Sequence, residues 1–85
     1  MTKVEIYIRK ACPYCGMAKK LLASKGQDWE EIDLDQEPNR TEEMMERAGG
    51  RMTVPEIFIN GDLVGGYDDL AALEAAGELD LLLTS

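Results

Sequence analysis

The sequence of 85 residues contains no histidine and only two cysteines, Cys12 and Cys15. A zinc ion in a protein takes four ligands, usually cysteine and histidine side chains. One copy of this chain therefore cannot build the usual zinc site, and no metal is expected. A metal ion shared between two chains, or completed by an external thiol, remains open.

Long apolar segments are also missing. No run of about 18 apolar residues, the length of a membrane-spanning helix, occurs in the chain. Residues 1–10, MTKVEIYIRK, lack the apolar stretch and the small-residue cleavage site of a signal peptide. We therefore expect a cytoplasmic protein without a membrane partner. In that reducing compartment a close cysteine pair is more often catalytic than structural.

Basic residues are scarce, because 17 acidic residues face 9 basic ones and the net charge is −8. Nucleic-acid binding needs a basic face that displaces counterions, so this class of partner is not expected. The charge is uneven, however. Residues 9–27 contain no acidic residue and five basic ones, whereas residues 52–85 contain no basic residue. Both cysteines lie in the basic segment, and Lys10 is close enough in sequence to act on a thiolate.

Apolar patterning and turn residues predict a single α/β domain over residues 1–85. The first two strands should pair in parallel because a helix connects them, and an Asn-Gly turn at 60–61 should join the last two in a hairpin. The predicted strands are residues 3–8, 28–35, 56–59 and 63–66. The predicted helices are residues 13–25, a segment opened by Pro38 with Asn39 and Glu42 as a capping pair, and a final region capped by Asp68 or Asp69 and broken at Gly77.

The two cysteines are three residues apart, a spacing that places both on one face of a helix. Cys12 is expected at the start of that helix, where free backbone N–H groups and the helix dipole favour a thiolate. In Cys-X-X-Cys motifs the pKa of the first thiol falls well below that of a free cysteine, and Pro13 suits a first helical position. We therefore expect Cys12 to be an exposed nucleophile and Cys15 a more buried resolving thiol. Two buried cysteines that act only as small apolar residues are the alternative, and the polar junction around Cys12 argues against it.

Three motifs in order resemble the glutaredoxin family, specifically its short bacterial dithiol type. They are CPYC at 12–15, TVP at 53–55 and GGYDD at 65–69, and the resemblance covers nearly the whole chain. It implies a thioredoxin-like fold in which βαβ is followed by ββα, with a four-stranded mixed sheet flanked by helices. It also implies a glutathione-dependent thiol–disulfide oxidoreductase that reduces protein disulfides and glutathione mixed disulfides, with a redox-active Cys12–Cys15 disulfide.

The resemblance further implies a glutathione site. Pro55 would be a cis-proline facing the cysteine pair, and Val54 would pair its backbone with the tripeptide as one strand pairs with another. The N–H groups at the start of the last helix would hold the γ-glutamyl carboxylate. Asp69, and after it Asp68, would meet the γ-glutamyl ammonium.

The glycyl carboxylate of glutathione needs a cation, for which the family position favours Lys10 over Arg51. Tyr14 would flank the reacting sulfur. The glutathione-binding residues implied by the resemblance are Lys10, Tyr14, Thr53, Val54, Pro55, Gly66, Tyr67, Asp68 and Asp69.

The sequence departs from common glutaredoxin patterns at Ile8, at Gly16 with Met17, and at Tyr67. These departures concern the reactivity of the thiol and the choice of substrate rather than the type of reaction.

The expected partners are glutathione and glutathionylated or disulfide-containing proteins, and the chain should be a monomer. Three alternatives remain open: a glutathione-bridged dimer that carries an iron–sulfur cluster, an electron donor coupled to thioredoxin reductase, and a non-catalytic interaction domain.

Overall fold

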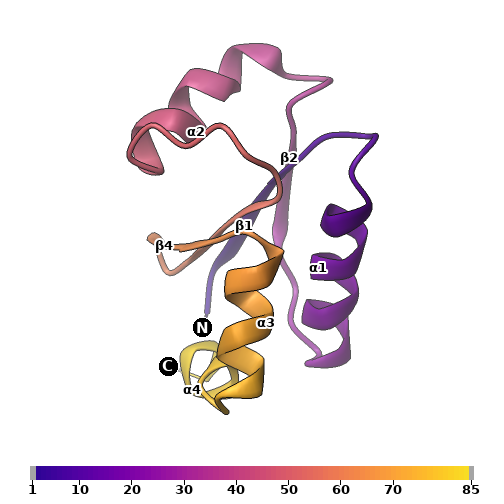
Figure 1. Ribbon diagram of the computed structural model, residues 1–85, viewed down its shortest axis with the longest axis vertical. Coiled ribbons are helices and arrows are strands. Elements are labelled where there is room, and N and C mark those ends of the chain that lie inside the picture. The colour runs from indigo at the N-terminus through magenta and orange to yellow at the C-terminus, as the bar shows by residue number, and fades with distance from the viewer. Residues whose placement is uncertain (1, 85) are drawn as a thin grey trace.

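The computed structural model describes residues 2–84 and contains a four-stranded mixed sheet in the order β2-β1-β3-β4 (Figure 1). β1 pairs in parallel with β2 and antiparallel with β3, and β3 pairs antiparallel with β4. The strands are β1 (Val4–Ile8), β2 (Glu30–Asp33), β3 (Glu56–Ile59) and β4 (Asp62–Gly65). The helices are α1 (Pro13–Ser24), the short 3-10 helix η1 (Pro38–Arg40), α2 (Thr41–Arg47), α3 (Tyr67–Ala75) and α4 (Leu79–Leu83). The predicted α/β class and mixed sheet with flanking helices are confirmed.

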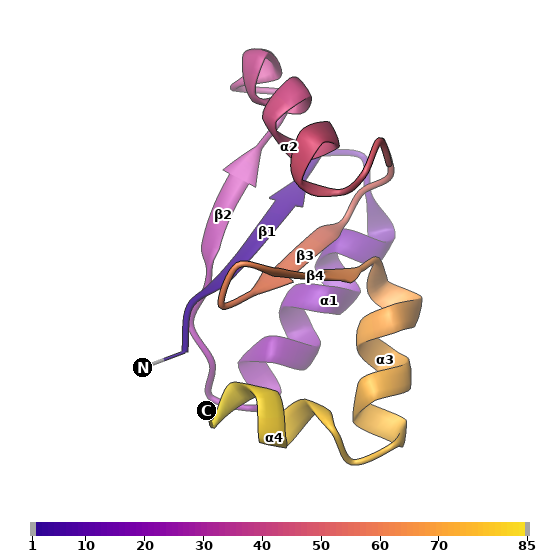
Figure 2. The same ribbon diagram turned by 90° about the vertical axis from the view of Figure 1, so that its left-hand side faces the viewer.

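Helices cover both faces of the sheet, so β1 is buried along its whole length. Figures 1 and 2 show α1 and α3 on one side of the sheet and α2 on the other. Successive strand residues point to opposite faces, and β1 therefore contributes to two cores. The core under α1, α3 and α4 contains Val4, Ile6, Ile8, Cys15, Ala18, Leu22, Ile57, Ile59, Leu70 and Leu79. The core under α2 contains Tyr7, Ile32, Leu34, Met44, Ala48 and Phe58. Among the described helices, none is both long and apolar enough to cross a bilayer.

The predicted helix caps are wrong at two places. Asn39 lies inside η1, which runs directly into α2, so that Arg40 rather than Asn39 precedes the helix. α3 begins at Tyr67 with Gly66 as its N-cap, ahead of both predicted capping residues. Asp69 nevertheless acts on this helix start from the third helical position, because its carboxylate accepts the Gly66 N–H at 3.0 Å. The predicted break at Gly77 is confirmed by the separate helix α4.

Arg47 ties α2 to the sheet through a group of polar contacts. Its guanidinium donates two hydrogen bonds to the Glu5 carboxylate, at 2.9 and 3.1 Å, and one to the Tyr7 hydroxyl at 2.9 Å. The same guanidinium lies 4.0 Å from the centroid of the Phe58 ring, and the Tyr7 hydroxyl donates to Glu43. The hydrogen bonds from Arg47 hold the pKa of Glu5 below its usual range. Ionised Glu5 therefore stabilises the packing of α2 on β1.

Replacing Arg47 with methionine keeps an apolar stem and removes the charge. We expect Arg47→Met to lower the free energy of unfolding at pH 7 by about 2 kcal/mol, since hydrogen bonds to a charged group contribute roughly 1.5–3 kcal/mol. The wild type should lose this contribution as the pH falls through the lowered pKa of Glu5, and the variant should lose less over the same range. Urea unfolding from pH 7 down to pH 3 measures both effects.

Arg9→Met is the matched control, because Arg9 pairs with Asp35 at 3.5 Å through side chains that are about two-fifths exposed. An exposed pair contributes about 0–1 kcal/mol. Equal losses in the two variants would contradict the role given to Arg47.

Gly16 is an exposed glycine in α1, and a Cβ placed there would meet no atom within 4 Å. Glycine in a helix costs about 0.5–1 kcal/mol relative to alanine. We expect Gly16→Ala to raise the free energy of unfolding by that amount in urea titrations. Gly65→Ala is the contrasting control, because Gly65 has a φ of +118° and its Cβ would lie 2.3 Å from Asp69 Oδ2. A Gly16→Ala variant no more stable than the wild type would contradict this account of α1.

Candidate functional site

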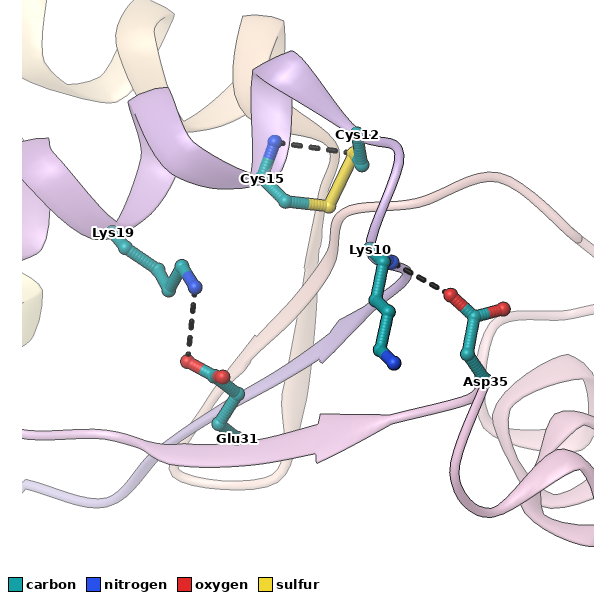
Figure 3. Close-up of a disulfide and its surroundings, with 6 residues drawn as sticks. All are labelled: Lys10, Cys12, Cys15, Lys19, Glu31 and Asp35. Carbon is teal, nitrogen blue, oxygen red and sulfur yellow. Dashed lines mark hydrogen bonds and ion pairs between the residues drawn. A yellow bond between two sulfur atoms is a disulfide. The ribbon is translucent and has the colours of Figure 1, made fainter.

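The two cysteines lie where the loop after β1 enters α1. Cys12 is the N-cap of α1 with an extended backbone, and Pro13 is the first helical residue. A disulfide joins Cys12 to Cys15, with the two Cα atoms 5.3 Å apart (Figure 3). The predicted placement of the pair at a helix start is confirmed.

The start of α1 directs one backbone donor at the first sulfur. The Cys15 N–H donates to Cys12 Sγ at 3.2 Å and to the Cys12 carbonyl at 3.1 Å. Cys15 is buried at 2% exposure, whereas Cys12 is half-buried. A thiolate formed at Cys12 by reduction would thus receive a hydrogen bond and the positive end of the helix dipole. The geometry suits a nucleophile at Cys12 and a shielded second thiol at Cys15.

The basic segment around the cysteines is engaged with acids of β2 and the turn after it. Arg9 pairs with Asp35 at 3.5 Å and Lys19 pairs with Glu31 at 3.2 Å, whereas Lys10 contacts Asp35 through its backbone N–H, at 2.7 Å. In Figure 3 the Lys10 side chain extends away from Cys12. The structure therefore does not gather this segment's charge on the sulfur, and the helix start supplies the local positive field.

A groove of about 260 Å³ lies beside the cysteine pair, between the loop before β3 and the start of α3. Its lining includes every predicted glutathione-binding residue except Lys10, and it adds Arg51. The lining residues are Tyr14, Arg51, Thr53, Val54, Pro55, Gly66, Tyr67, Asp68 and Asp69. Three chain segments that are far apart in sequence thus meet at one surface.

One wall of the groove is the loop that leads into β3. The Val54–Pro55 peptide bond is cis, as the family resemblance implied. The ladder between β1 and β3 ends at Glu56, and within residues 2–84 the backbone of Val54 makes no hydrogen bond. An extended peptide can therefore pair with this backbone as a further strand.

The opposite wall is the start of α3. Because Gly65 has no Cβ, the Asp69 carboxylate and the Arg51 guanidinium can approach its Cα. Asp69 Oδ2 lies 3.9 Å from Arg51 Nη2 and also accepts the Gly66 N–H. The Tyr67 ring stacks on Tyr14 with 6.1 Å between centroids. This contact gives the unusual Tyr67 a partner beside the cysteines.

Sequence reasoning missed Glu56, the residue that follows Pro55. Its side chain is fully buried, with Thr53 Oγ1 at 3.4 Å and Arg51 Nε at 3.8 Å from Oε2. Burial raises the pKa of this carboxyl, while Arg51 and Thr53 act in the opposite direction. An acidic residue that opens the otherwise apolar segment EIFI was the available signal.

Within residues 2–84, no cluster of three or more side chains that could hold a metal ion occurs.

Known proteins are similar to this chain in both sequence and fold. The glutaredoxin family model matches residues 4–64. Glutaredoxin 3 of Escherichia coli (strain K12) is 52% identical over 83 residues, which cover 98% of this chain and 99% of the relative. The solution structure of glutaredoxin from Brucella melitensis has a TM-score of 0.82 at 54% identity, over 98% of this chain and 89% of that one. The crystal structure of a buckwheat glutaredoxin–glutathione complex has a TM-score of 0.89 at 30% identity, over 98% and 77%.

These matches confirm the thioredoxin-like fold. The family model spans both cysteines, the cis-proline loop and β3, and the relatives match almost the entire chain. The chain therefore belongs to the glutaredoxin family and is a glutathione-dependent thiol–disulfide oxidoreductase.

Proposed function

We propose that this oxidoreductase reduces glutathione mixed disulfides and protein disulfides, with Cys12 as the nucleophile and Cys15 as the resolving thiol. The observation that carries the proposal is the position of Cys12, half-buried at the start of α1 with the Cys15 N–H on its sulfur. Cys12, Val54 and Tyr67 pack against the same core. The sulfur and both walls of the groove therefore belong to one rigid unit.

With a glutathionylated substrate, the Cys12 thiolate attacks the glutathionyl sulfur. The bond between Cys12 and glutathione forms while the substrate–glutathione bond breaks, and the substrate leaves as a thiolate that takes a proton from water. A second glutathione thiolate then attacks the glutathionyl sulfur on Cys12. Glutathione disulfide leaves, and Cys12 is again a thiolate.

With a protein disulfide, Cys12 forms a mixed disulfide with one substrate sulfur and releases the other as a thiolate. Cys15 loses its proton and attacks Cys12 Sγ, which releases the second substrate sulfur and closes the Cys12–Cys15 disulfide. Two glutathione molecules reduce this disulfide and leave as glutathione disulfide. The 5.3 Å between the Cα atoms supports closure of that bond.

We assign the groove to glutathione. The free backbone of Val54 suits the tripeptide backbone, and the helix start at Gly66 and Tyr67 suits the γ-glutamyl carboxylate. Arg51 lines the groove and is the cation that we assign to a glutathione carboxylate. Lys10 lies outside the lining, so its part in binding requires its side chain to turn toward the groove.

The two aspartates of the groove differ in their contacts. The sequence favoured Asp69 for the γ-glutamyl ammonium. Asp69 already accepts the Gly66 N–H, whereas Asp68 has no hydrogen-bond or ion-pair partner within residues 2–84. We therefore assign Asp68 to the γ-glutamyl ammonium, and we assign Asp69 to holding the helix start and Arg51.

We further propose that residues 1–85 act as one domain and as a monomer, in the cytoplasm, where glutathione keeps thiols reduced.

The cysteine roles are separated by single replacements. In glutathione-dependent reduction of a glutathionylated peptide, Cys12→Ser should lower the rate at least 100-fold because it removes the nucleophile. Cys15→Ser should keep at least half of that rate, because the monothiol route does not use Cys15, yet it should lose reduction of protein disulfides. The glutathione route would be contradicted if Cys15→Ser lost both activities while the wild type still reduced protein disulfides with thioredoxin reductase as its electron source.

The aspartate roles are separated by affinity and stability. We expect Asp68→Ala to raise the KM for the glutathionylated peptide, whose glutathionyl group occupies the groove, about two- to fivefold, with unchanged stability. This is the effect of one partly exposed ion pair of about 0.5–1 kcal/mol. Asp69→Ala, unlike Asp68→Ala, should lower the free energy of unfolding, by about 1 kcal/mol, because the Gly66 N–H loses its acceptor. Steady-state kinetics and urea unfolding of both variants provide the comparison. An unchanged KM in Asp68→Ala would refute its assignment.

A further inference from the structure

Glu56 is a fully buried carboxyl group that the thiol–disulfide chemistry does not use. Its Oε2 atom has Thr53 and Arg51 as neighbours. Its Oε1 atom is buried and, within the described residues 2–84, has no hydrogen-bond partner. A buried polar atom without a partner is costly, and the cost is larger for a charged form than for a neutral one. The balance between the two forms of Glu56 therefore depends on Arg51.

Arg51 is shared between two carboxylates and the groove. Its Nε lies 3.8 Å from Glu56 Oε2, and its Nη2 lies 3.9 Å from Asp69 Oδ2. Both distances are longer than a charge-assisted hydrogen bond of about 2.7–2.9 Å. The Arg51 side chain is 44% exposed and lines the groove. It can therefore accept a third carboxylate from a ligand at the cost of its hold on Glu56.

We propose that Glu56 and a carboxylate of glutathione compete for Arg51, so that ionised Glu56 weakens glutathione binding and Glu56 takes up a proton from the solvent when glutathione binds. This inference rests on the proposed assignment of the groove to glutathione. A ligand carboxylate on Arg51 brings a further negative charge toward the buried group and withdraws the cation that stabilises its ionised form. Glu56 is then an affinity-determining residue that acts through Arg51 without touching the ligand.

The charged and titratable groups around Glu56 support this coupling. Arg51 and the Thr53 hydroxyl favour its ionised form, whereas burial and the negative charge of Asp69 on α3 favour its neutral form. Tyr7 lies opposite Glu56 in the β1–β3 register, and its hydroxyl is engaged by Arg47 and Glu43 of α2. Arg51 is thus the cation whose position a ligand in the groove can change.

The absence of histidine makes the proton linkage measurable. Between pH 5 and 8 the side chains that ordinarily titrate are histidines, and this chain has none. We would titrate the protein with its Cys12–Cys15 disulfide intact, so that neither cysteine titrates. The ligand would be S-methylglutathione, which keeps both carboxylates and cannot exchange disulfides. Calorimetry in buffers of different ionisation enthalpy gives the Kd and the number of protons taken up at each pH. The wild type, Glu56→Gln and Glu42→Gln would be compared, the last being an exposed carboxylate of α2 outside the groove.

The wild type should bind S-methylglutathione less tightly as the pH rises through the ionisation of Glu56, with proton uptake in that range. Glu56→Gln should bind at least threefold more tightly at pH 8 and show neither the pH dependence nor the uptake, while Glu42→Gln should match the wild type. In an Arg51→Met background, Glu56→Gln should change the Kd less than twofold, which separates competition for Arg51 from a general effect of charge.

Equal affinity and equal proton uptake in the wild type and Glu56→Gln would overturn the inference while leaving the glutathione groove intact. A threefold gain that persists in the Arg51→Met background would also overturn it. No binding of S-methylglutathione to the folded wild type would instead refute the groove assignment, and the inference with it.

Discussion

Strand β1 packs against helices on both of its faces, and the chain leaves it directly into the loop that carries Cys12. The side of β1 that faces α1 and α3 belongs to the same core as Cys15, and the side that faces α2 is held by Tyr7 and the Arg47–Glu5 pair. A strand fixed on both faces cannot shift its register without exposing one of the two cores. The end of β1, and with it the helix start that presents the cysteine sulfur, is therefore held in place.

The loop before β3 depends on the same strand. β3 pairs with β1, and the ladder ends at Glu56, one residue after the cis-proline. Beyond that point the backbone of Val54 is left open, beside the helix start of α1 and opposite the start of α3. The end of the ladder thus leaves an unpaired loop backbone in the wall of the groove. In our proposal a tripeptide pairs with this backbone and brings its own thiol toward Cys12.

The charged groups beside the groove are arranged around one guanidinium. Arg51 faces Glu56 on one side and Asp69 on the other, and the missing Cβ of Gly65 leaves the room in which Arg51 and Asp69 meet. Asp69 also receives the Gly66 N–H, so the cation and the helix start are linked through one carboxylate. A ligand carboxylate that enters this group must redistribute these contacts, which makes affinity sensitive to charges that lie behind the groove wall.

The sequence alone predicted the order of elements and the cysteine pair well, because these depend on local signals: the alternation in β1, the Asn-Gly turn between β3 and β4, and a proline after Cys12. The cis peptide at Pro55 followed only from the family resemblance, since most bonds of this kind are trans. Glu56 and the position of Arg51 could not be predicted, because their burial and contacts arise where segments distant in sequence meet. The predicted cap of α2 was wrong because Asn39 lies in a 3-10 turn that runs into the helix. The predicted cap of α3 was wrong because that helix begins at Tyr67, before both aspartates, with Gly66 as its N-cap.

The most direct test of the account is a crystal structure of Cys15→Ser reacted with glutathione disulfide. The account predicts one glutathione molecule joined to Cys12 through a disulfide bond. Its backbone should pair with Val54, and its γ-glutamyl carboxylate should lie at the start of α3. A glutathione attached to Cys12 but lying outside the groove, away from Val54 and α3, would contradict it.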